Sequence, residues 1–195
     1  MKILSKHIPE NAVELVNEML EDHPVQLKIV NNRTTKHGDF KRTKNGDLQI
    51  TVNKNLNSYQ FLLTLVHEVA HLVTYKEKKH LKPHGIEWKC NFQHLMLPFL
   101  RPSIFPQQLL PHLAKYLKNP KASTGSDVNL TYALKQYDEK SGKCFIFELQ
   151  QGSIFSFKNK TYKKGNLRRT RIECTEIKSN KKYLFNQNAE VNLIN

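Results

Sequence analysis

Residues 61–74 read FLLTLVHEVAHLVT, and we predict that this stretch forms a buried helix with one polar face. Its apolar positions fall in two stripes at helical spacing: Leu62, Val66, Val69 and Val73 in one, and Phe61, Leu65 and Leu72 in the other. A helix that is apolar nearly all round belongs in a protein core. Ionisable groups in a core are costly unless they are paired or bind an ion, so His67, Glu68 and His71 indicate an ion site.

The spacing of these three residues is that of a metal site. At about 100° per residue, His67 and His71 lie about 40° apart and one turn removed, so both imidazoles can reach one ion. Glu68 stands beside them and can take a proton from a metal-bound water. This His-Glu-x-x-His pattern is typical of zinc hydrolases. The alternative is a surface helix whose polar residues face water, and the apolar flanks argue against it.

A catalytic zinc takes three protein ligands and keeps one position open. The candidates for the third ligand are His80, His84, His94, His112 and Glu87. We favour His84, because Gly85 permits an unusual backbone angle or a close approach to the metal helix, and Trp88 can pack against the site. Glu87 remains an alternative, either as the ligand or as a residue that orients one.

The composition suggests a basic protein with one domain, or one domain and a small appendage. Its 195 residues carry 31 Lys and Arg against 17 Asp and Glu, for a net charge of +14 and a pI near 9.7. Such an excess favours a polyanionic partner, most simply nucleic acid, over a generally basic surface.

The chain also carries features of a cytoplasmic protein. No apolar run is long enough to span a membrane, and the first residues lack a secretory signal. The cysteines, Cys90, Cys144 and Cys174, are odd in number and widely separated, which fits free thiols in a reducing compartment. We therefore expect no membrane partner.

The order of expected elements places the metal helix in an N-terminal domain, residues 1–120. We expect helices over 8–20, 61–74, 83–97 and 110–117, and strands over 25–30, 35–42 and 48–52, with an Asn45-Gly46 hairpin turn. Residues 119–126 have linker composition. Beyond them, in a second domain over 121–195, we expect short strands over 130–134, 144–149, 153–157, 169–174 and 182–185.

The second domain holds most of the charge. Residues 156–182 carry ten basic residues against two acids. We expect nucleic acid to contact Lys163, Lys164, Arg168, Arg169 and Arg171. Phosphates would meet these charges, whereas the nearby aromatics alternate as core residues of a sheet do, so we do not assign them to base stacking. Residues 28–44 form a second basic segment that suits a nucleic-acid or substrate groove.

The His67-Glu68-x-x-His71 motif, followed after twelve residues by His84-Gly85 and then Trp88, resembles the SprT-like family, which includes the Spartan-type proteases. The resemblance covers about the first 120 residues. It implies an α+β, zincin-like zinc metalloendopeptidase domain in which His67, His71 and His84 hold Zn2+ and Glu68 activates a zinc-bound water.

The resemblance also bears on the substrate and on the second domain. In eukaryotic members the activity is DNA-dependent cleavage of proteins crosslinked to DNA, so we expect DNA and a protein substrate as partners. Many members carry a zinc ribbon after the protease part. Here Cys144 and Cys174 stand alone, which indicates a small all-β, zinc-ribbon-like module that lacks its cysteine pairs and relies on hydrophobic residues.

Two other functions remain open from the sequence. One is a non-catalytic zinc- and nucleic-acid-binding regulatory protein, in which His94 or Glu87 fills the fourth position at the metal. The other is a zinc hydrolase that acts on something other than protein. The sequence does not give the oligomeric state.

Overall fold

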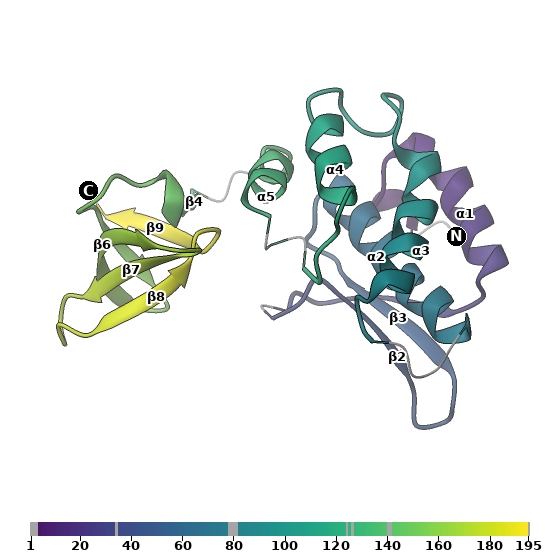
Figure 1. The fold of residues 1–195 in the computed structure, drawn as a ribbon, viewed down its shortest axis with the longest axis horizontal. Helices are drawn as coiled ribbons and strands as arrows, with labels where there is room; N and C mark the ends of the chain where they lie inside the picture. The colour runs from purple at the N-terminus through teal and green to yellow at the C-terminus, as the bar shows by residue number, and fades with distance from the viewer. Residues whose placement is uncertain are drawn as a thin grey trace. The chain divides into compact units, whose positions relative to one another are not determined.

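The computed structural model describes residues 4–33, 35–77, 82–123, 125, 127–139 and 142–194. The chain forms two compact units, residues 1–138 and 139–195 (Figure 1). Each unit has its own hydrophobic core. The described residues form five α-helices and two sheets, so the expected α+β class is found. None of the described helices has the length and apolar character needed to cross a membrane.

The first unit contains a three-stranded sheet in the order β1-β3-β2. Its strands are β1 (Gln26–Val30), β2 (Gly38–Arg42) and β3 (Leu48–Asn53), and the helix before them is α1 (Val13–Asp22). β1 runs parallel to β3, whereas β2 is antiparallel to it and lies at the sheet edge. The hairpin between β2 and β3 turns at Gly46 (φ +93°). The Thr43 N–H donates to the Asp47 carbonyl, which closes the loop around residues 44–46, so the loop is longer than the expected two-residue turn.

The predicted metal helix is α2 (Ser58–Glu77), which contacts β2 and β3 (Figure 1). Asn57 caps it, since its Oδ1 accepts a hydrogen bond of 2.9 Å from the Gln60 N–H. Both apolar stripes lie in the core except Val73, which is partly buried against it, and Phe61 and Val66 have no exposed surface. Burial on all sides therefore explains why this segment is apolar nearly all round.

Three more helices complete the first unit: α3 (Ile86–Met96), which packs on α2, α4 (Leu110–Leu117) and α5 (Val128–Lys135). The predicted strand over 130–134 was wrong, because these residues lie in α5. The Asp127 side chain caps this helix by accepting a hydrogen bond of 3.0 Å from the Leu130 N–H. Leu130 and Leu134, one turn apart, are buried in the core of the first unit. The first unit therefore extends to Asp138, past the boundary expected at residue 120.

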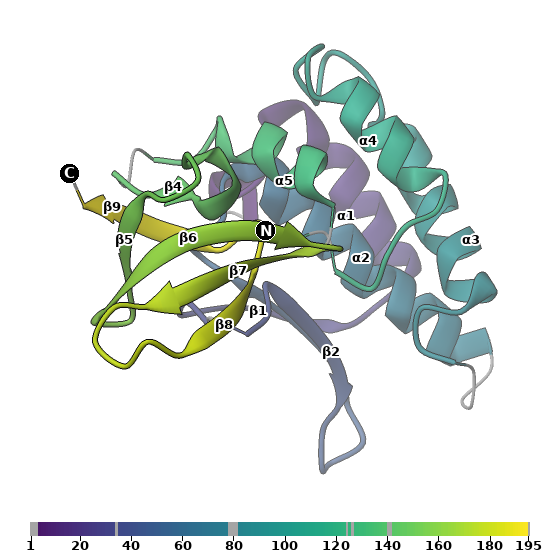
Figure 2. The ribbon, with the colours of Figure 1, turned by 60° about the vertical axis from the view of Figure 1, so that its left-hand side comes forward.

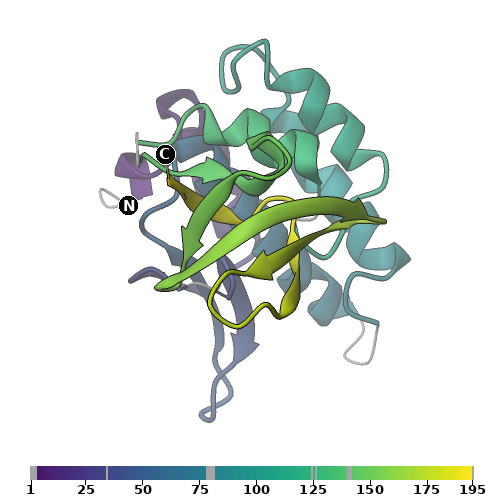
Figure 3. The same ribbon diagram turned by 90° about the vertical axis from the view of Figure 1, so that its left-hand side faces the viewer.

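The second unit is a six-stranded sheet in the order β4-β9-β5-β6-β7-β8, and every pairing in it is antiparallel. Its strands are β4 (Cys144–Phe145), β5 (Ile154–Phe157), β6 (Lys160–Arg168), β7 (Arg171–Glu176), β8 (Lys182–Asn186) and β9 (Glu190–Ile194). Figures 2 and 3 show it from two sides, with β6 as a long curved strand. The predicted strand over 144–149 was wrong beyond Phe145, where a 3-10 turn follows, and β6 and β9 were missed.

The core of this second unit is apolar. Phe155 and Tyr162 are buried in it, as their alternation predicts, and so is Cys174. In the described part of the chain, no cluster of metal-ligating side chains includes a cysteine.

One buried carboxylate also helps to hold the second unit. Glu176 accepts hydrogen bonds from Ser179 Oγ at 2.6 Å and Tyr183 Oη at 3.1 Å, and it pairs with Lys160 Nζ at 3.0 Å. These contacts lower the pKa of Glu176 to about 2, and the hydrogen bonds from Ser179 and Lys160 have the largest effect.

Candidate metal centre and catalytic site

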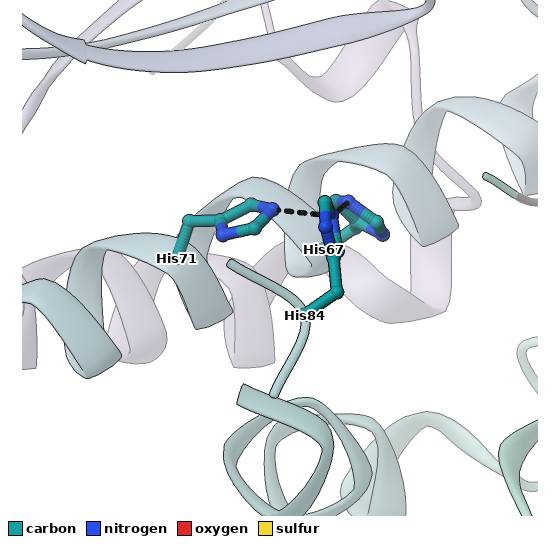
Figure 4. A group of neighbouring side chains, drawn as sticks. All are labelled: His67, His71 and His84. Atoms are coloured by element: carbon teal, nitrogen blue, oxygen red, sulfur yellow. Dashed lines mark hydrogen bonds between the residues drawn. The ribbon is translucent and has the colours of Figure 1, made fainter. Parts of the chain in front are cut away.

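Three histidines converge in the first unit. His67 and His71 come from α2, and His84 comes from the turn before α3. Their ligand nitrogens all lie within 4.8 Å of one another, and Figure 4 shows the rings turned towards a common point. His84 Nε2 is 2.9 Å from His71 Nε2 and 3.3 Å from His67 Nε2. The structure therefore brings together the three residues that the sequence analysis selected.

These distances fit a single zinc ion. With Zn–N bonds of about 2.0–2.1 Å and tetrahedral angles, two nitrogen ligands lie about 3.3–3.4 Å apart. The 3.3 Å between the Nε2 atoms of His84 and His67 already has this value. The Nε2 atoms of His84 and His71, 2.9 Å apart, would have to separate by about 0.5 Å. Small changes in the side-chain torsion angles of His71 and His84 are enough for a shift of this size.

Neutral imidazoles are needed to bind a metal, and burial keeps these rings neutral. Burial, with the proximity of the other two histidines, lowers the pKa of His67 to about 3. Burial, with His84 nearby, lowers that of His71 to about 4, and burial also lowers the pKa of His84. At neutral pH all three therefore keep a lone pair free for a cation.

The other candidate ligands lie apart from this group. Within the described residues, the histidine trio is the one cluster of three or more side chains that could hold a metal. His94 lines a separate small cavity between α1 and α3, His112 is exposed on α4, and Glu87 is exposed in the first turn of α3. His80 lies outside the described residues.

Trp88 packs against all three histidines. Its ring centroid is 4.6 Å from those of His67 and His84, in edge contacts, and 5.3 Å from that of His71, with the planes nearly parallel. Phe92 stacks on it at 5.1 Å, and Trp88 has no exposed surface. The indole Nε1 donates to the His67 carbonyl at 3.5 Å. This packing limits the rotation of the three imidazoles.

The turn that carries His84 corrects one expectation. The unusual backbone angle falls on His84 itself, with φ +58°, a region in which histidine is enriched among non-glycine residues. Gly85 has φ −68°. Its N–H donates to the Lys82 carbonyl at 2.9 Å, and a Cβ at Gly85 would lie 2.9 Å from that same oxygen. Glycine is therefore needed here to close the turn, and not for an approach to α2.

Glu68 lies against the edge strand β2. Its side chain is buried, and a Cβ added to Gly38 would lie only 2.5 Å from Glu68 Oε1. Burial, and then the charge of Asp39, raise the pKa of Glu68 to about 8, while a hydrogen bond from the Phe40 backbone lowers it in part. The carboxyl group is thus held by a strand that the motif itself does not contain, and no sequence signal pointed to Gly38.

A cleft opens at the site. Two cavities of about 320 and 430 Å³ share four lining residues: Gly38, His67, Glu68 and Ala122. His37 and Ser123 line the first cavity, and Tyr75 and His84 line the second. The cleft therefore extends along β2 to both sides of Glu68, which leaves room for a chain-like substrate to pass the histidines.

The predicted nucleic-acid residues of the second unit do not all share one role. Lys164 points inward, where its Nζ donates to the carbonyls of Phe147 at 3.2 Å and Leu149 at 2.5 Å. Burial lowers its pKa. Lys164 therefore stabilises the second unit and does not belong to the predicted nucleic-acid surface. Arg169 lies in the turn between β6 and β7 (φ +55°).

The remaining predicted residues share one face of the sheet with a lysine that the sequence analysis missed. Arg168 and Arg171 are cross-strand partners, and the Glu173 carboxylate pairs with both Arg168 at 3.5 Å and Lys182 at 3.1 Å. Lys163 and Lys182 both pair in register with Thr175 of β7. The strand register therefore places four cations on one face, which we call the basic face (Lys163, Arg168, Arg171 and Lys182), and two of them pair with Glu173.

Comparison with known proteins bears on the first unit. Residues 7–102 match the model of the SprT-like family. This span includes α1, the three-stranded sheet, α2 and α3, and with them the histidine trio and Glu68. Searches of the curated proteins and of the solved structures found no match.

Proposed function

We propose that this chain, which belongs to the SprT-like family through residues 7–102, is a zinc-dependent metalloendopeptidase with a zincin-like catalytic domain. The family indicates a metalloprotease-type domain. The observation that carries the finer proposal is the convergence of three Nε2 atoms beside a buried carboxylate in one open cleft. The geometry favours His67, His71 and His84 as the residues that hold the ion.

A zinc ion held there supplies an activated water near neutral pH and polarises the carbonyl of the peptide bond to be cleaved. The residues of the chain do the rest. The positive charge of a bound cation would favour the ionised form of Glu68 and so lower its pKa. Ionised Glu68 takes the proton of the attacking water and later delivers it to the leaving amine. β2 is an edge strand that lines the cleft, so an extended substrate segment can lie along its outer side.

The test is the Glu68→Gln variant with metal retained. Glutamine keeps the size of the side chain but cannot take a proton, so we expect the rate of peptide cleavage to fall by about 10²–10⁴-fold. Metal content should stay that of the parent, since the histidines are untouched. A variant that cleaves as fast as the parent would refute the role of Glu68.

The alternative of a non-catalytic zinc- and nucleic-acid-binding protein requires a fourth side chain at the metal. Among the described residues, none joins the three histidines, and the cleft lies open beside them. The geometry therefore favours the enzyme.

We further propose that the substrates are proteins associated with DNA or crosslinked to it. The net charge of +14 and the basic face of the second unit support this proposal. If the second unit holds DNA, proteins on that DNA reach the protease at a high effective concentration.

The salt dependence of DNA binding tests the role of the basic face. Each phosphate contact contributes about 0.9 to the slope of log K against log salt for duplex DNA, so replacing all four cations with glutamine should reduce the slope by about 3–4. A control variant with glutamine in place of Lys41, Arg42 and Lys44 should keep the slope of the parent. The reverse result would place the DNA surface in residues 28–44.

A further inference from the structure

Asn53, the last residue of β3, carries a buried amide with every polar group engaged. Only 1% of its surface is exposed. Its Nδ2 donates to the carbonyls of Arg33 at 3.1 Å and Lys36 at 2.9 Å, and its Oδ1 accepts from Arg33 Nε at 2.8 Å. Its backbone N–H donates to the His37 carbonyl at 2.9 Å. One residue thus holds both ends of the segment that leads into β2.

This segment leads directly to the catalytic cleft. Lys36 and His37 line the first cavity, and Lys36 pairs with Asp39 at 2.8 Å. Gly38, the next residue in the chain, lies against the Glu68 carboxylate. A displacement of the segment therefore moves the strand on which Glu68 rests.

We propose that Asn53 is a positioning residue for the catalytic cleft: it fixes Arg33, Lys36 and His37 so that β2 holds Glu68 in place. This inference rests on the proposed peptidase function. Asn53 lies on β3, while the three histidines lie on α2 and in the turn before α3, so its effect on the cleft is separable from metal binding.

The chain offers a matched control in Gln49, a buried amide on the same strand. Its Nε2 donates to Gln26 Oε1 at 2.6 Å, a contact with β1 on the side of β3 away from β2. Both Asn53→Leu and Gln49→Leu remove a buried amide and lower stability. Asn53→Leu alone leaves the Arg33 and Lys36 carbonyls without their partner.

Activity at equal folded fraction is the first readout. A misplacement of about 1 Å costs about 10²-fold in rate, so kcat of Asn53→Leu should fall by about that factor, with the metal dissociation constant unchanged. Gln49→Leu should keep the kcat of the parent. If Asn53→Leu does not fold, Asn53→Asp serves in its place, because it keeps the acceptor for Arg33 Nε and loses both donors.

Hydrogen exchange of the backbone amides is a second readout that needs no activity. In the Asn53 variant, the amides of residues 35–40 should exchange faster, whereas the Gln49 variant should leave them protected as in the parent. Unchanged exchange, or an equal loss of kcat in both variants, would overturn the role of Asn53. If the parent cleaves no peptide, the proposed function fails, while exchange still decides whether Asn53 fixes this segment.

Discussion

Gly38→Ala is the substitution that tests most sharply how β2 places Glu68, the proposed general base. The added Cβ would lie 2.5 Å from Glu68 Oε1, 2.7 Å from Thr64 Cγ2 and 2.8 Å from Glu68 Cγ. Carbon atoms in contact prefer about 3.5–4.0 Å, so the strand or the carboxylate must move by about 1 Å. Thr64 cannot yield easily, because it is buried in α2 and its hydroxyl bonds to the Gln60 carbonyl at 2.7 Å.

The size of the expected effect follows from this displacement. A shift of about 1 Å costs about 10²-fold in rate, or about 2.7 kcal/mol of transition-state stabilisation. The assay is kcat/KM for an unfolded protein substrate, measured together with metal content and thermal unfolding. We expect the metal content to be unchanged, because the three histidines come from α2 and the turn before α3.

Gly125→Ala is the matched control, since Gly125 also lines the cleft. A Cβ there meets Ser123 Oγ at 3.5 Å, which is ordinary contact, so the parental rate should be kept. A Gly38→Ala protein that binds metal, stays folded and cleaves at the rate of the parent would show that β2 does not set the position of Glu68.

Three further substitutions test packing, charge and capping. Trp88→Ala should lower the free energy of unfolding by roughly 3–5 kcal/mol and weaken metal binding by about tenfold or more, seen by calorimetry and metal titration. Unaltered metal affinity would contradict its role against the histidines. Glu176→Gln should lower the melting temperature at pH 7 but not at pH 2. The pKa of Glu176 in the folded protein, about 2, lies below its ordinary value of 4.5. The ionised carboxylate therefore stabilises the fold above pH 4.5, and this stabilisation is lost as the pH falls towards 2. An equal fall in melting temperature at both pH values would argue against this charge effect. Asp127→Ala should cost about 1 kcal/mol through the lost cap of α5, and an unchanged melting curve would contradict it.

The histidine cluster was the part of the candidate site most accessible from the sequence. His67 and His71 follow from helical periodicity, which is a local property that residues 61–74 carry in full. His84 required the additional match of residues 84–88 to a second motif. The contact of Glu68 with Gly38 was not accessible, because the two residues are 30 positions apart and only strand pairing and helix packing join them.

The errors have similar physical causes. Residues 130–134 form a short apolar run, which periodicity alone does not assign to helix or strand, and the deciding cap lies outside the run at Asp127. The direction of Lys164 depends on its pairing with the buried Cys174 of β7, and Lys163 and Arg168 share a face only because of the irregularity between Lys164 and Leu167 in β6. The role of Asn53 depends on partners 17 and 20 residues earlier in the chain.

The metal content of the purified protein and of its His84→Ala variant tests the central claim most directly. Equilibrium dialysis against zinc should give one tightly bound ion per chain, and the variant should lose it while α2 and the sheet stay folded. A cobalt-substituted sample should show three nitrogen ligands and one exchangeable position. A parent that takes up no stoichiometric metal, or a spectrum with four protein ligands, would contradict the account.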